Sequence, residues 1–133
     1  MVVKMGTGAI SWASRLQTIQ TLSTTEAEYV SAVAAAQELL WLRNLFTEFG
    51  YPCDKLPLFM DNQSAIQVAK NPEHHGRMKH LDLRFYYWLR HVVASGAIVL
   101  RFVGTDDMAA DCLTKPFGKV KMALAREQLG LYL

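Results

Sequence analysis

The chain has 133 residues, 51% of them hydrophobic and 11% aromatic, which fits one folded domain and excludes wholesale disorder. Its net charge of +2 is too small to indicate a nucleic-acid partner by itself, because the placement of charge matters more than the sum. Two cysteines, Cys53 and Cys112, are too few for a disulfide framework or a metal cluster. We expect reduced thiols, no signal peptide, no membrane span and an intracellular location in the cytoplasm or nucleus.

The first part of the chain predicts a hairpin followed by a long helix. Residues 2–5 and 9–14 are short runs with β-branched or aromatic side chains on either side of a glycine turn. Ser23 and Glu26 then form a capping box, in which the hydroxyl reaches the Glu26 N–H and the carboxylate reaches back. The helix is expected to run to about Phe49 and to stop at the following glycine.

The rest of the chain predicts alternating strands and helices. In chain order we expect a strand at 56–60, a helix at 63–70, a polar loop at 73–80, a helix at 81–94, a strand at 97–103, a short helix capped by Thr105 and running to about Lys115, and a terminal amphipathic helix at 119–129. The order predicts an α/β fold with a mixed sheet covered by helices. Residues 1–133 are expected to form a single domain.

Glu28 is the most informative acidic position. Steps of three and four residues from it give an apolar stripe along the long helix, formed by Ala32, Ala35, Leu39, Leu42 and Phe46. A carboxylate on a buried face needs a partner or a metal ion. The alternative is an exposed glutamate that the helix dipole favours in the first turns. Glu26, in contrast, is explained by the capping box.

Asp61 and Asp111 are two further candidate acids. Asp61 follows an apolar strand, which would place its carboxylate at the carboxyl edge of the sheet, although it could instead cap the next helix. Asp111 lies in the short late helix, where a carboxylate has no evident structural task, whereas Asp106 and Asp107 are expected in a first helical turn. Hard divalent cations prefer carboxylate oxygens. Together these acids indicate a metal-dependent phosphoryl-transfer site.

Four separated motifs resemble the ribonuclease H domain of copia-type retrotransposon polyproteins. They are Ala-Ile-Ser-Trp-Ala-Ser-Arg-Leu-Gln at 9–17 with Leu-Ser-Thr-Thr-Glu-Ala-Glu-Tyr at 22–29, Asp-Asn-Gln-Ser-Ala at 61–65, Lys-His-Leu-Asp-Leu-Arg at 79–84, and Ala-Asp-Cys-Leu-Thr-Lys-Pro at 110–116. The resemblance covers nearly the whole chain, with the motifs in the same order and at similar spacing.

The resemblance implies a ribonuclease H-like fold, a five-stranded mixed sheet flanked by helices. Enzymes of this family cut the RNA strand of RNA/DNA hybrids with two Mg²⁺ ions, which Mn²⁺ can replace. The two ions lie about 4 Å apart; one activates a water molecule and the other stabilises the leaving oxygen. By the motifs, Glu28, Asp61 and Asp111 would be both the catalytic acids and the metal ligands.

The chain departs from the family pattern at its beginning. The family has a first, central strand with a catalytic Asp before the hairpin, whereas this sequence has no Asp or Glu before Glu26. We therefore expect an N-terminally truncated domain with most of its activity lost. Unpaired sheet edges would then favour a homodimer or a strand donated by another protein. The alternative is a catalytically inactive, host-recruited protein of the same fold that acts through protein–protein or nucleic-acid binding.

A basic segment is the candidate nucleic-acid contact. Its members are Lys70, His74, His75, Arg77, Lys79, His80 and Arg84. Contacts to phosphates would explain this composition, since they dominate nucleic-acid affinity. A solvated basic loop would explain it equally well, and His80 could form a local pair with Asp82. One of the histidines could also assist product release, by analogy with related enzymes. For Trp12 and Tyr29 we expect core packing rather than stacking on bases.

Overall fold

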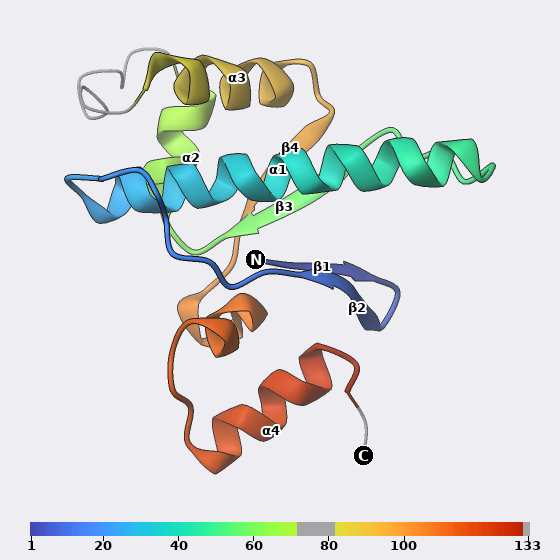
Figure 1. The fold of residues 1–133 in the computed structure, drawn as a ribbon, viewed down its shortest axis with the longest axis vertical. Helices are drawn as coiled ribbons and strands as arrows, with labels where there is room; N and C mark the ends of the chain where they lie inside the picture. Colours follow the sequence, from blue (N-terminus) through green and yellow to red (C-terminus); the bar gives the residue numbers. More distant parts are fainter. Residues whose placement is uncertain (72–81, 132–133) are drawn as a thin grey trace. The chain divides into compact units, whose positions relative to one another are not determined.

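The computed structural model describes residues 1–71 and 82–131, and this part of the chain separates into two compact units (Figure 1). Unit 1 comprises residues 1–18 and the segment from 104 onward, and unit 2 comprises residues 19–103. Each unit contains helical segments and one pair of strands, which confirms the predicted α/β class. Whether residues 1–133 act as one domain stays a prediction.

The elements follow the predicted order closely. In chain order they are β1 (Val2–Met5), β2 (Gly8–Trp12), α1 (Thr24–Glu48), β3 (Leu56–Met60), α2 (Gln63–Lys70), α3 (Leu83–Ala94), β4 (Ile98–Phe102), the 3₁₀ turns η2 (Thr105–Asp107) and η3 (Ala109–Leu113), and α4 (Lys119–Gln128). The loop predicted at 73–80 lies outside the described residues. No helix in the described part of the chain is long and apolar enough to cross a membrane.

Helix α1 of unit 2 begins and ends where the local sequence predicts. The Ser23 hydroxyl accepts a hydrogen bond from the Glu26 N–H at 3.1 Å, which satisfies one of the free donors of the first turn. At the other end, the helix stops before Gly50, whose φ of +86° is a left-handed conformation that favours glycine. The helix buries Tyr29, Ala32, Val33, Ala35, Ala36 and Leu42.

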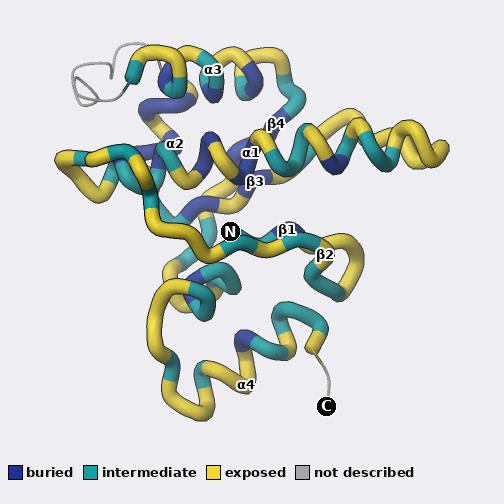
Figure 2. Tube along the Cα trace, in the orientation of Figure 1, coloured by how far each residue is buried: buried dark blue, intermediate teal, exposed yellow. Residues whose placement is uncertain are grey.

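Strands β3 and β4 form the parallel sheet of unit 2. Their register runs from Leu56 opposite Ile98 to Met60 opposite Phe102. Alternation along β3 buries Leu58 and Met60 and leaves Phe59 50% exposed. Helix α1 packs against β3, whereas α2 and α3 pack against β4. The buried core of unit 2 therefore lies between these helices and the sheet, as the dark segments of Figure 2 show.

A buried tyrosine pair joins α1 to α3. The Tyr29 hydroxyl donates a hydrogen bond of 2.9 Å to the Tyr86 backbone carbonyl, and the two rings stack with centroids 6.0 Å apart. The guanidinium of Arg90 lies over the Tyr86 ring at 5.3 Å. Burial raises the pKa of Tyr29 well above its ordinary value, and the neighbouring Tyr86 raises it further. Tyr29 is thus a core residue, as predicted.

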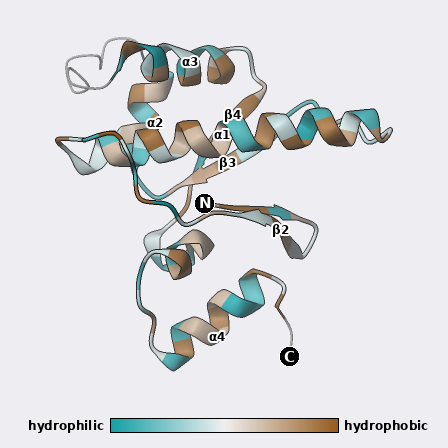
Figure 3. Ribbon diagram, viewed as in Figure 1, coloured by the Kyte–Doolittle hydropathy of each residue, from teal (hydrophilic) through white to brown (hydrophobic). Residues whose placement is uncertain are grey.

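Unit 1 is built from both ends of the chain. Strands β1 and β2 pair in antiparallel fashion, with an irregularity between Val3 and Lys4. The Ala9 N–H donates to the Leu129 carbonyl at 2.9 Å, which fastens the end of α4 to the hairpin. Hydrophobic and hydrophilic residues are interspersed along α4 (Figure 3), and the helix buries Ala125 but leaves Val120 and Leu124 78% and 55% exposed.

Three details of the prediction are wrong. Thr105 does not cap a helix: the turn begins at Gly104, and extended backbone at Met108 divides the segment into two 3₁₀ turns. Helix α3 begins at Leu83 rather than at residue 81, because the Asp82 side chain caps it by accepting from the backbone N–H of Arg84. The side chain of Trp12, at the last position of β2, is 66% exposed and is not a core residue.

Candidate functional site

Glu28 lies in the second turn of α1 and is partly buried. The stripe predicted below it is confirmed, because Ala32, Ala35 and Leu42 are buried and the other members are partly buried. Glu26 is only 3% exposed, and its carboxylate accepts from the backbone N–H of Leu22 at 2.7 Å, so it performs the expected capping. Glu26 is thus explained by the cap, whereas Glu28 stands at the head of the apolar stripe.

Asp61 directly follows β3 and is partly buried. Its alternative role as a helix cap is taken by Asn62, whose side-chain oxygen accepts from the Ala65 N–H at 3.0 Å. The acid thus stands at the carboxyl end of a parallel strand, where sites in α/β folds tend to form. Figure 1 shows β3 running back along α1, so the end of β3 and the first turns of α1 lie at the same end of unit 2.

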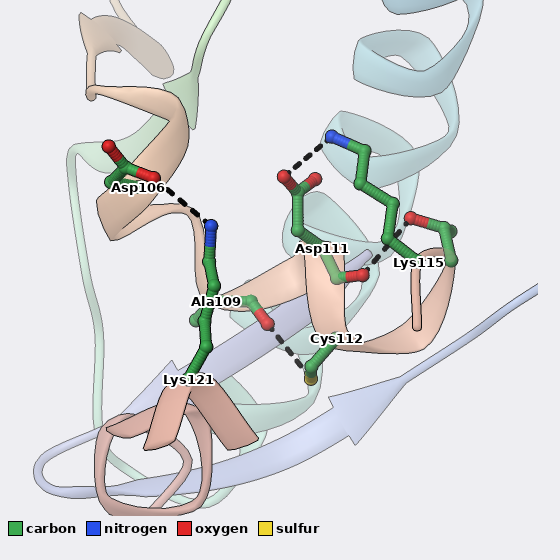
Figure 4. A network of polar contacts seen from close by, with 7 residues as sticks. Asp106, Ala109, Asp111, Cys112, Lys115 and Lys121 are labelled. Carbon is green, nitrogen blue, oxygen red and sulfur yellow. Dashed lines mark hydrogen bonds and ion pairs between the residues drawn. The ribbon is translucent and has the colours of Figure 1, made fainter. Parts of the chain in front are cut away.

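Asp111 lies in η3 of unit 1 and is 9% exposed. Its Oδ2 forms an ion pair with the Lys115 Nζ at 2.7 Å (Figure 4). Its backbone carbonyl also accepts from the Lys115 N–H at 2.8 Å. The adjacent thiol of Cys112 donates to the Ala109 carbonyl at 3.1 Å, which occupies this cysteine within the turn. Asp111 therefore has a cationic partner, which the sequence analysis did not foresee.

The carboxylates fit a hard divalent cation by their chemistry. Glu28 and Asp61 belong to unit 2 and Asp111 to unit 1. Within each unit, the described residues include no group of three or more His, Cys, Asp or Glu side chains that could hold a metal ion. The assignment of these three acids as metal ligands stays a prediction.

The basic segment is only partly described. Five of its predicted phosphate contacts lie outside the described residues, namely His74, His75, Arg77, Lys79 and His80. Lys70 ends α2 and is exposed, and the Arg84 side chain is 88% exposed at the start of α3. Hydrogen bonds from Arg84 hold the pKa of Asp82 below its ordinary value. Asp82 therefore pairs with Arg84, and it neutralises part of the charge that Arg84 presents.

Three curated proteins match almost the whole chain. It is 39% identical to the retrovirus-related Pol polyprotein from transposon TNT 1-94 of Nicotiana tabacum, over 125 aligned residues that make up 94% of the chain. It is 38% and 36% identical, each over 131 residues and 98% of the chain, to the corresponding polyproteins from transposons RE2 and RE1 of Arabidopsis thaliana. The chain is homologous to transposon Pol polyproteins. It spans about 9% of the length of these Pol relatives.

No family model and no solved structure matches this Pol-related chain. The matches to the RE2 and RE1 polyproteins span 98% of the chain and include all three candidate acids.

One candidate functional residue was missed at the level of sequence. Lys115 follows Asp111 by four residues, and this spacing places two side chains on the same side of a helical turn. The spacing could have predicted the ion pair.

Proposed function

We propose that this chain is a ribonuclease H-like domain of a copia-type transposon polyprotein, and that it cuts the RNA strand of RNA/DNA hybrids by metal-dependent hydrolysis. The observation that carries the proposal is the position of Asp61, a partly buried carboxylate at the carboxyl end of a parallel strand whose adjacent helix is capped by Asn62 instead. Homology to transposon Pol polyproteins supports it, since the matches run through all the motifs of the site.

In this proposal, Glu28, Asp61 and Asp111 are each ligands for Mg²⁺ or Mn²⁺. When bound, such ions supply an activated water and stabilise the leaving oxygen of the phosphodiester. Asp61 presents its carboxylate from the end of β3, and Glu28 presents its carboxylate from the beginning of α1. Both residues are partly buried, which limits the rotamers that their side chains can adopt.

Basic residues of the segment from Lys70 to Arg84 are proposed to bind the phosphates of the hybrid. Lys70 and Arg84 stand at either end of the segment and are exposed, as such contacts require. Arg84 would have to share its guanidinium between Asp82 and a phosphate, because its Nε and Nη2 groups already donate hydrogen bonds to the Asp82 carboxylate at 2.8–3.2 Å. Lys70 is consequently the stronger candidate of the two.

The test is cleavage of an end-labelled RNA/DNA hybrid with Mg²⁺ or Mn²⁺ by the wild type, by Asp61→Asn and by Asp54→Asn. Asp54 is an exposed acid in the loop before β3, so it controls for the loss of one negative charge. We expect cleavage that is lost in Asp61→Asn and retained in Asp54→Asn. Equal cleavage by both variants would remove Asp61 from the site.

A second candidate function rests on the ion pair between Asp111 and Lys115, in which one of the three candidate metal ligands already has a cationic partner. The chain would then be a non-catalytic, host-recruited protein of the same fold that binds nucleic acid or protein. It predicts a folded protein that does not cut the hybrid under any metal condition. Retained binding of an uncut hybrid, measured by fluorescence anisotropy, would favour this function over the first.

Partners and location complete the proposal. In the described residues each sheet has two strands, so every strand has one unpaired edge. We propose that a strand from a second copy or from another protein pairs with such an edge and extends the sheet. Sedimentation over a range of concentrations tests self-association. We also propose a location in the cytoplasm or nucleus, which microscopy of a fluorescently tagged chain would test.

A further inference from the structure

The ion pair between Asp111 and Lys115 differs from the other lysine–aspartate pair of unit 1. The Asp111 side chain is 12% exposed, and the Lys115 side chain is 53% exposed. In the second pair, between Asp106 and Lys121, the N–O distance is 3.0 Å and the Asp106 side chain is 97% exposed. Water can solvate Asp106 if its lysine leaves, whereas Asp111 is largely shielded from water and needs a cation beside it.

The backbone of η3 explains how the lysine reaches this carboxylate. The Asp111 carbonyl accepts hydrogen bonds from the backbone N–H groups of Thr114 at 3.0 Å and Lys115 at 2.8 Å. These bonds bring Lys115 one turn beyond Asp111, so that its ammonium lies 2.7 Å from Oδ2 (Figure 4). The lysine stem is half exposed, so the ammonium can swing into solvent without breaking these backbone bonds.

We propose that Lys115 is the counter-ion of Asp111 in the metal-free protein, and that a divalent cation must displace it in order to bind. The inference rests on the proposed function, since it takes Asp111 as a metal ligand. An ammonium within hydrogen-bond distance of Oδ2 and a divalent cation on the same oxygen repel each other and compete for the same lone pairs. Lys115 thereby weakens the site for the cation while keeping the carboxylate in position without one.

The test compares Mn²⁺ affinity of the whole chain in the wild type, Lys115→Met, Lys121→Met and Asp111→Asn, by isothermal titration calorimetry at fixed ionic strength. Lys121→Met is the matched control, because it removes the same charge from the exposed pair of the same unit. We expect Lys115→Met to bind Mn²⁺ about tenfold more tightly than the wild type, a change of about 1.4 kcal/mol. Lys121→Met should bind within about twofold of the wild type, and Asp111→Asn should bind more weakly.

A second measurement separates this role from a purely structural one. Without metal, Lys115→Met should have a lower Tm than the wild type, because the shielded carboxylate loses its partner. Saturating Mn²⁺ should raise the Tm of Lys115→Met more than that of the wild type, since the stabilisation by a ligand grows with its affinity. A purely structural lysine predicts the same deficit in Tm with and without Mn²⁺. If Lys115→Met does not fold, Lys115→Gln removes the charge and keeps a hydrogen-bond donor.

The outcomes also distinguish the two proposals. If Lys115→Met and Lys121→Met bind Mn²⁺ equally, while hybrid cleavage still depends on Asp61, the inference about Lys115 is wrong and the proposed function stands. If neither the wild type nor any variant binds Mn²⁺, both are wrong. Tighter binding that occurs only in Lys115→Met supports the counter-ion.

Discussion

Replacing Tyr29 by Phe tests whether the tyrosine pair holds α1, and with it the turn that carries Glu28, against α3. The ring is 0% exposed, and its hydroxyl donates a buried hydrogen bond to Tyr86. Phe keeps the ring and its stacking on Tyr86, so the substitution removes only the hydroxyl. The carbonyl that loses this donor lies within α3, where it still faces the helical N–H four residues further on.

The expected loss in the free energy of unfolding is about 1 kcal/mol, the usual net value of one intramolecular hydrogen bond. With a urea m-value of about 2 kcal/mol/M for a small protein, the unfolding midpoint should fall by about 0.5 M. Tyr29→Ala, which also empties the buried ring position, should cost about 3–5 kcal/mol. Urea denaturation followed by far-UV circular dichroism measures both changes.

Tyr51→Phe is the control for this experiment, because the Tyr51 side chain is 72% exposed. Its midpoint should remain within about 0.1 M of the wild type, as is usual for surface substitutions. A midpoint for Tyr29→Phe that coincides with that of Tyr51→Phe would refute the reasoning. A changed m-value would show that the substitution altered more than one hydrogen bond.

Three further predictions concern the ends of helices. Asn62→Ala should lower the stability of unit 2 by about 1 kcal/mol in urea denaturation, because it removes the cap of α2. Gly130→Ala should lower the Tm clearly and cost at least about 2 kcal/mol, because its φ is +73° and an added Cβ would lie 2.5 Å from a backbone oxygen of the β1–β2 turn. Gly8→Ala, at a glycine with no atom within 4 Å of an added Cβ, should cost much less. Hydrogen bonds from Arg84 lower the pKa of Asp82 below its ordinary value of 3.8. The Asp82 carboxylate, as helix cap and as partner of Arg84, therefore stabilises α3 above pH 3.8, and this stabilisation is lost as the pH falls through the lowered pKa. Acid titration of helicity should therefore show a step below this pH in the wild type and none in Asp82→Asn.

Much of the fold could be predicted because its signals are local. The bounds of β3 and α2 agree with the prediction to the residue, since each element lies between short turn segments and has a clear apolar pattern. The start of α1 follows from the capping box at Ser23 alone. The segment after β4 was predicted less well, because a threonine before two acids is a common helix start, and only the extended backbone at Met108 decides that the helix is divided.

The candidate site divides in the same way. Asp61 and Glu28 could be selected from their places at the end of a strand and on an apolar stripe. Either residue of the Asp-Asn sequence could cap α2. The structure selects Asn62, because its extended backbone places its side-chain oxygen at the start of the helix. The partner of Asp111 was open to prediction from its spacing of four residues to Lys115, although the segment forms a 3₁₀ turn in place of the expected regular helix. Local patterns thus identify candidate acids, and the geometry of short turns decides what each acid contacts.

The construction of unit 1 from both ends of the chain has a consequence for biosynthesis. The hairpin is translated first, yet the carbonyl that receives the Ala9 N–H belongs to Leu129, 129 − 9 = 120 residues later. At about 5–20 residues per second, the ribosome needs roughly 6–24 s to supply it. Unit 2 is encoded without interruption between the two halves and can fold during this interval. The hairpin, in contrast, lacks its hydrogen bond to the end of α4 until that helix has been made.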